Sequence, residues 1–127
     1  MIRPALEKEE YVVCDRFFDS TIVYQGYGRG FVPTDLQRIN LFATRGLIPD
    51  LTILLDLSVY KGFERLKYRG QKRDTFEQLG MDFHERVRQG YLELVRNEPE
   101  RFRVVDASFD EDSVAELVWQ TYENRFR

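Results

Sequence analysis

Three short apolar runs interrupt an otherwise polar chain. They cover residues 11–14 (YVVC), 51–57 (LTILLDL) and 102–107 (FRVVDA). Continuous apolar runs of this kind are typical of strands that are covered on both faces in a parallel sheet. The pattern therefore predicts three buried strands, and it places Cys14 inside the first of them.

Amphipathic segments lie between and after these runs, with apolar residues spaced at the period of a helix. Hydroxyl residues stand where two of the segments begin and glycines where they end, as helix caps require. The order of strands and helices favours an α/β domain with right-handed crossovers, in which ligands bind beyond the carboxyl ends of the strands. The predicted helices cover residues 34–46 (Thr34 to Gly46), 58–70 (Ser58 to Gly70), about 76–97 and about 111–126.

Composition limits the function without naming it. The 127 residues fit one domain, and 19 basic against 22 acidic residues give a net charge of −3. Proteins that bind the phosphate backbone usually carry a basic excess. One cysteine forms no disulfide within the chain, and no apolar run is long enough to span a membrane. We expect a cytoplasmic protein with neither nucleic acid nor membrane as a partner.

The glycines of the stretch CDRFFDSTIVYQGYGRG (14–30) suggest a phosphate-binding loop. A dinucleotide fingerprint, however, needs G-x-G-x-x-G directly after a strand and at the start of a helix. Here the spacing is G-x-G-x-G, and the glycines come where a helix begun at Ser20 would be ending. The favoured interpretation is a glycine-rich turn that closes a short helix.

Asp15 and Arg16 follow the first predicted strand. A carboxylate at this place can hold Mg²⁺ or its waters, and a guanidinium beside it can bind phosphate with two parallel hydrogen bonds. A local salt bridge is the alternative. In a helix that starts near Ser20, Thr21, Tyr24 and Gln25 share one face. Their hydroxyl, ring and carboxamide suit a pyrimidine nucleoside, although an ordinary polar helix face would look the same.

A second basic segment follows the middle strand. Such a run is usually a solvated helix face or a surface loop, and its one aromatic residue, Tyr68, argues against a nucleic-acid-binding module. In phosphoryl transfer, a mobile loop that bears arginines can close over ATP and stabilise the charge of the transferred group. The basic residues are Arg65, Lys67, Arg69, Lys72 and Arg73. The lone histidine, His84, has no ligand partner at a suitable spacing, so we expect it to pack or to lie at the surface.

The stretch at 15–30 resembles the Asp-Arg motif and following helix of bacterial thymidylate kinases, which transfer the γ-phosphoryl group of ATP to dTMP. The resemblance continues in order along the whole chain, and the run D-R…S-T…Y-Q-G-x-G-R-G is its most specific part. The later motifs are PDLTILLDL (49–57), RLKYRG (65–70), FHERVRQGYLELV (83–95) and VVDAS (104–108).

The resemblance implies a role for each matching residue. On the acceptor side, Arg16 contacts the phosphate of dTMP, and Asp15 orders that phosphate and a metal-bound water. Thr21 and Gln25 read the thymine edge, while Tyr24 packs on the deoxyribose. Lesser acceptor-side roles fall to Ser20 at the helix start and to Arg29 near the phosphate. On the donor side, the LID spans about 65–77 and contributes Arg65, Arg69 and Arg73 as contacts to ATP.

Two departures from the family pattern bear on activity. The LID reads Asp-Thr-Phe-Glu at 74–77 where the family often has Asp-Arg-(Ile or Phe)-Glu, so which arginine acts stays open. The donor-phosphate loop, G-x-x-x-x-G-K-[ST], does not occur in the 127 residues. We therefore expect this chain alone to bind ATP weakly and to show little kinase activity. A non-catalytic nucleotide-binding remnant or one half of a split kinase is the alternative.

The family's parallel sheet has the strand order 2-3-1-4-5, and the three predicted strands match strands 3, 4 and 5. We expect residues 1–127 to form one incomplete P-loop-kinase-like α/β domain with three layers, part of a longer gene product. Without strand 1, the strands at 11–14 and 51–57 either close up or leave the core open. The resemblance also implies Mg²⁺ with ATP, and a homodimer.

Overall fold

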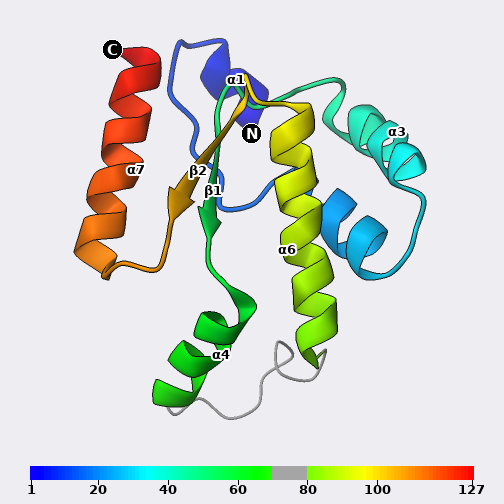
Figure 1. Ribbon diagram of the computed structural model, residues 1–127. Helices are drawn as coiled ribbons and strands as arrows, with labels where there is room; N and C mark the ends of the chain where they lie inside the picture. The colour runs from blue at the N-terminus through cyan, green and yellow to red at the C-terminus, as the bar shows by residue number, and fades with distance from the viewer. Residues whose placement is uncertain (70–79) are drawn as a thin grey trace.

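The computed structural model describes residues 1–69 and 80–127. Helices dominate this part of the chain, and two short strands lie between them (Figure 1). The elements are α1 (Ile2–Leu6), α2 (Phe18–Thr21), the π-helix η1 (Ile22–Gly28), α3 (Pro33–Thr44), β1 (Thr52–Asp56), α4 (Val59–Tyr68), α6 (Gly80–Asn97), β2 (Phe102–Asp106) and α7 (Glu111–Phe126).

Strands β1 and β2 form a parallel pair, as predicted for their two apolar runs. The register aligns Thr52 with Phe102 at one end and Asp56 with Asp106 at the other. Helix α7 lies on one side of the pair and α6 on the other (Figure 1). The predicted arrangement of three layers, with helices on both faces of a parallel sheet, is confirmed for this part of the chain.

The strand predicted at 11–14 is wrong. These four residues have no regular secondary structure in the described chain, and the pairing given for β1 is with β2. Tyr11 and Val13 are 74% and 95% exposed, and Cys14, expected to be buried, is exposed as well. A strand is stabilised by hydrogen bonds to a neighbouring strand. No such hydrogen bonds pair residues 11–14 with a strand in the described chain, so the apolar run forms no strand.

Most predicted helices are present, with differences at their ends. The Ser58 hydroxyl accepts a hydrogen bond from the Lys61 N–H at 3.3 Å, so the predicted cap of α4 is confirmed. Helix α7 covers the predicted residues 111–126. Helix α3, in contrast, begins at Pro33 and not at a Thr34 cap, because proline at the first helical position needs no N–H partner. Residues 76–79 of the long predicted helix lie outside the described residues.

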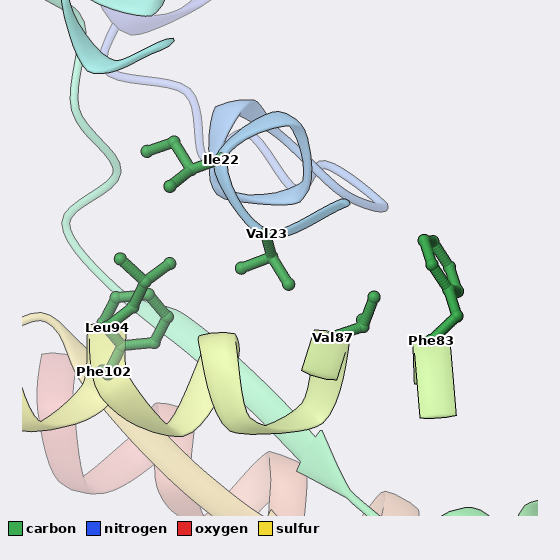
Figure 2. Close-up of a cluster of buried hydrophobic side chains, with 6 residues drawn as sticks. All are labelled: Ile22, Val23, Phe83, Val87, Leu94 and Phe102. Carbon is green, nitrogen blue, oxygen red and sulfur yellow. The ribbon is translucent and has the colours of Figure 1, made fainter. Parts of the chain in front are cut away.

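The hydrophobic core lies where η1 packs against α6. Figure 2 shows two side chains of η1 directed towards those of α6, with β2 contributing from below. Val23 is completely buried. Partly buried aromatic rings, including those of Tyr24 and Tyr91, pack against the cluster from outside. The cluster consists of Ile22, Val23, Phe83, Val87, Leu94 and Phe102.

Two glycines allow η1 and α6 to approach each other closely. A β-carbon at Gly28 would stand 2.7 Å from the Phe83 ring. A β-carbon at Gly90 would stand 2.7–2.9 Å from the ring and β-carbon of Tyr27. Atoms this near the Tyr27 backbone cannot move aside without moving η1. The helix that carries the predicted site is therefore seated on α6 at these two positions.

Replacing Gly90 with alanine is expected to lower the free energy of unfolding by about 1–3 kcal/mol, the usual cost of an extra methyl group in a packed interior. Urea denaturation followed by circular dichroism measures the change. Gly62→Ala is the matched control, because a β-carbon at Gly62 meets nothing within 4 Å and alanine favours helices. Equal stability of the two variants would contradict this account of the interface.

Within residues 1–69 and 80–127, no helix is both long enough and apolar enough to cross a membrane.

Candidate functional site

The Asp-Arg motif forms a bend that leads into α2. Arg16 adopts a left-handed backbone conformation, with φ of 65°. A side chain other than glycine pays roughly 1–2 kcal/mol for this conformation. Such strain is found where the surrounding structure holds a residue in a required direction, and it often marks functional positions. Asp15 beside it is exposed.

Arg16 is held by the helix that follows it. Its Nε–H donates a hydrogen bond to the Ser20 Oγ at 3.2 Å. Its guanidinium carbon lies 4.6 Å from the centre of the Tyr24 ring, within the range of a cation–π interaction. These two contacts fix the guanidinium over the exposed side of α2 and η1. An alternative that the sequence left open, a salt bridge between Asp15 and Arg16, is not among the ion pairs of the described residues.

Tyr91 joins this group from α6. Its hydroxyl lies 3.0 Å from the Ser20 Oγ, so Ser20 contacts Arg16 on one side and Tyr91 on the other. Burial raises the pKa of the Tyr91 phenol above its ordinary value, and this outweighs the lowering by the hydrogen bond to Ser20 and by the Arg16 charge. The phenol therefore stays neutral at physiological pH. We call Arg16, Ser20, Tyr24 and Tyr91 the Arg16 cluster.

A buried ion pair anchors the start of this helix to the sheet. Asp19 and Arg101 form two hydrogen bonds of 2.8 and 2.9 Å, and both side chains are more than 90% buried. Arg101 also donates to the Thr52 hydroxyl on β1 and to Glu98. Burial alone would lower the pKa of the Arg101 guanidinium, but the hydrogen bonds to Asp19 and Glu98 outweigh it and raise the pKa. The charged Arg101 guanidinium thus fixes α2, through Asp19, against the amino end of β1.

Helix α6, which carries Tyr91 of the Arg16 cluster, is tied to the carboxyl end of the sheet. Arg88 of α6 forms a bidentate ion pair with Asp56, the last residue of β1, at 2.8 and 3.0 Å. The Asp56 carboxylate raises the pKa of Arg88. Tyr91 follows Arg88 by three residues, which is roughly 4.5 Å along a helix axis. Helix α6 thus carries Tyr91 within one turn of the residue that binds the carboxyl end of β1.

The first arginine of the basic segment reaches the same edge. Arg65 in α4 donates hydrogen bonds of 3.1 Å to the backbone carbonyls of Ser108 and Phe109, just beyond β2. Asp106 ends β2 there, and hydrogen bonds from the Ser108 hydroxyl and N–H lower its pKa. Arg65 therefore ties α4 to the loop that follows the sheet.

The other predicted site residues are placed as follows. Thr21 is exposed, and Tyr24 and Gln25 are half-buried, whereas Ile22 and Val23 between them are buried. Thr21 thus faces outward, whereas the Tyr24 ring packs partly against the core cluster, and the π-helical part is wider than the predicted α-helix. The glycine-rich turn closes the helix as predicted, since Gly30 has a φ of 85°. Arg29 and Arg69 are exposed, and Arg73 and residues 70–77 of the predicted LID lie outside the described residues.

Several residues that build this part of the structure were not predicted from the sequence. Tyr91 resembles an ordinary core residue in an amphipathic helix, and no local pattern links it to Ser20, 71 positions away. Asp56 could have been predicted as a site residue. It lies at the end of the apolar run of β1, just as Asp15 lies at the end of the run at 11–14. Asp19 and Arg101 are polar residues next to apolar segments. The sequence pattern does not indicate that they pair, and only the three-dimensional structure shows it.

Metal-ligating side chains are sparse in the part of the chain that the structure describes. No group of three or more His, Cys, Asp or Glu side chains is placed to hold an ion there. His84 is buried, and its ring makes edge-to-face contacts with Phe63 and Phe83, which confirms the expectation of a packing histidine.

The chain is similar to known proteins over most of its length. The family profile of thymidylate kinase matches residues 1–118. The chain is 49% identical over 125 residues to the thymidylate kinase of Solidesulfovibrio magneticus and 52% identical over 114 residues to that of Desulfovibrio desulfuricans. These matches cover 94% and 85% of this chain, but 60% and 52% of the two relatives.

A solved structure gives the same answer for the fold. The thymidylate kinase of Ehrlichia chaffeensis superposes with a TM-score of 0.72 at 28% sequence identity, over 97% of this chain and 55% of that one. The chain therefore spans little more than half the length of the relatives it matches, and the predicted fold class is confirmed. A likeness that extends over nearly all of its residues, in sequence and in fold, establishes that the chain belongs to the thymidylate kinase family.

Proposed function

We propose that this chain carries the acceptor-binding side of a thymidylate kinase, an enzyme that transfers the γ-phosphoryl group of ATP to dTMP. The observation that carries the proposal is the Arg16 cluster, in which a guanidinium is held in a fixed direction beside a polar helix face. The chain belongs to the thymidylate kinase family, and this supports the choice of dTMP among the nucleotides that such a surface could bind.

In this proposal the acceptor phosphate binds to the Arg16 guanidinium, whose flat fork matches two phosphate oxygens. The nucleoside lies along the outer side of α2 and η1. Tyr24 packs against the deoxyribose, and the Gln25 carboxamide, which can donate and accept at once, pairs with the thymine edge together with Thr21. An oxygen of the dTMP phosphate forms the new bond to the γ-phosphorus while the bond to the β–γ bridging oxygen breaks, which gives dTDP and ADP.

The donor side of the proposal is less complete in this chain. Arg65, Arg69 and Arg73 are the proposed contacts to the phosphates of ATP, where cations stabilise the charge of the transferred group. Mg²⁺ is usually held by one or two carboxylates and by the substrate phosphates, and the exposed Asp15 fits that pattern through a bound water. The ion would neutralise phosphate charge. A homodimer and a cytoplasmic location belong to the same proposal.

Calorimetric titration of the 127-residue chain with dTMP, dAMP and thymidine tests the acceptor assignment. We expect dTMP to bind at least about tenfold more tightly than dAMP, which presents a different base edge, and more tightly than thymidine, which lacks the phosphate. Turnover of dTMP with ATP and Mg²⁺, followed by ADP release, should stay far below an ordinary kinase rate of 1–100 s⁻¹.

Equal affinity for dTMP and dAMP would overturn the proposal of a thymidylate site. Ordinary turnover by the chain alone would leave that site standing, but it would overturn the expectation that donor binding depends on a P-loop that these 127 residues do not contain.

A further inference from the structure

We propose that Tyr91 is a positioning residue of the acceptor site: through Ser20, its hydroxyl fixes the direction in which Arg16 presents its guanidinium. The inference rests on the proposed function, because it assigns the phosphate of dTMP to Arg16. It adds a residue that comes from a different helix and that does not itself touch the nucleotide.

The first step is the hydrogen-bond chain. A serine hydroxyl has one donor and two acceptor positions. The Ser20 Oγ accepts from the Arg16 Nε–H at 3.2 Å and lies 3.0 Å from the Tyr91 hydroxyl, so both its neighbours constrain the rotation of one small group. With its Nε–H used in this way, the guanidinium is oriented by a bond at its inner end.

The second step is the difference in mobility between the two ends of this chain. Arg16 is exposed, and an exposed arginine loses side-chain rotamer entropy when it binds a phosphate. Tyr91 is half-buried on α6 and its ring packs against the buried core cluster. Tyr91 is therefore the more firmly packed end, and Ser20 transmits its position to the exposed Arg16. Orientation before binding reduces the entropy lost on binding.

The third step is the place of Tyr91 on α6. Arg88, three residues earlier on the same helix, is fixed to the end of β1 by its ion pair with Asp56. Helix α6 thus connects the carboxyl end of the sheet to the Arg16 cluster through two neighbouring side chains. The position of Tyr91, and through Ser20 the direction of the guanidinium, is therefore set by a helix that is fixed to β1, and not by α2 alone.

Tyr91→Phe tests the proposal in the full 127-residue chain, because it removes the hydroxyl and keeps the packed ring. We expect the affinity for dTMP to fall about fivefold to tenfold and the affinity for thymidine to change less than about twofold, since one hydrogen bond to a charged network is lost. Tyr27→Phe is the matched control. Tyr27 is another half-buried tyrosine that packs on α6, and its hydroxyl makes no hydrogen bond among the described residues.

A double-variant cycle shows whether Tyr91 acts through Ser20. Ser20→Ala is expected to weaken dTMP binding at least as much as Tyr91→Phe, and the double variant should be no weaker than Ser20→Ala alone. Full additivity of the two losses would overturn the proposal. So would an equal loss of dTMP and thymidine affinity in Tyr91→Phe, because that result marks a structural role alone.

A spectroscopic measurement keeps the test independent of nucleotide binding. The Nε–H resonance of Arg16, assigned by its loss in Arg16→Lys, should shift in Tyr91→Phe and stay in place in Tyr27→Phe. An unchanged resonance would overturn the proposed relay. If wild-type chain binds dTMP no more tightly than thymidine, the acceptor-site proposal fails, and the resonance still decides whether Tyr91 orients Arg16.

Discussion

Replacing Asp19 with asparagine is expected to lower the free energy of unfolding by about 3 kcal/mol, one of the two largest effects that the structure predicts. Asp19 is 5% exposed and Arg101 is 8% exposed, and the two share a bidentate pair. The variant leaves the Arg101 guanidinium buried with Glu98 as its remaining carboxylate partner. Urea denaturation at neutral pH, followed by circular dichroism, measures the loss.

The surface pair of Glu93 and Arg96 provides the matched control, because both its side chains are more than 40% exposed. Exposed pairs contribute about 0–1 kcal/mol, so Glu93→Gln should change stability little. An Asp19→Asn effect no larger than that of Glu93→Gln would contradict the assigned role of the buried pair. The double replacement Asp19→Leu with Arg101→Met should recover much of the loss, since it removes both buried charges together.

The same pair bears on the proposed function because Asp19 directly precedes Ser20. Arg101 connects Asp19 to Thr52 on β1, and the Asn40 side chain donates to the Phe18 carbonyl at 3.1 Å. These bonds tie the first turn of α2 to β1 and to α3. A variant that loosens this turn is expected to weaken dTMP binding even though Asp19 itself is buried away from the proposed nucleotide.

The sequence was a good guide wherever a segment carries its own structural information. The spacing of apolar residues predicted α7, and the Ser58 cap predicted the start of α4. β1 and β2 were recognisable because each is a continuous apolar run that finds a parallel partner. The run at 11–14 has the same local pattern but pairs with no strand among the described residues, so it forms none. Strand formation depends on the partner and cannot be settled by the run itself.

The candidate site shows a similar division. Arg16, Ser20 and Tyr24 lie within nine residues, so their contacts are local along the chain. Tyr91 was out of reach because its contact with Ser20 depends on how closely α6 and η1 approach, and that depends on glycines such as Gly90. The roles of Arg69 and Arg73 at ATP stay predictions.

Replacing Arg16 with glutamine is expected to weaken dTMP binding about 100-fold and to leave thymidine binding within about twofold of wild type. Charge-assisted hydrogen bonds to a phosphate are each worth about 1.5–3 kcal/mol, and tenfold in affinity corresponds to about 1.4 kcal/mol. Calorimetric titration with both ligands measures the two affinities. Arg38→Gln, which changes an exposed arginine on α3, is the charge-matched control and should alter neither.

Two further observations separate a directed phosphate contact from general electrostatic attraction. Arg16→Lys retains the positive charge but loses the Nε–H that donates to Ser20, so its dTMP affinity should lie between those of wild type and Arg16→Gln. Added salt should weaken dTMP binding by wild type more than by Arg16→Gln, because exposed charges are screened. If Arg16→Lys bound dTMP as tightly as wild type, charge alone would suffice, and the cluster's orientation of Arg16 would have no part in recognition.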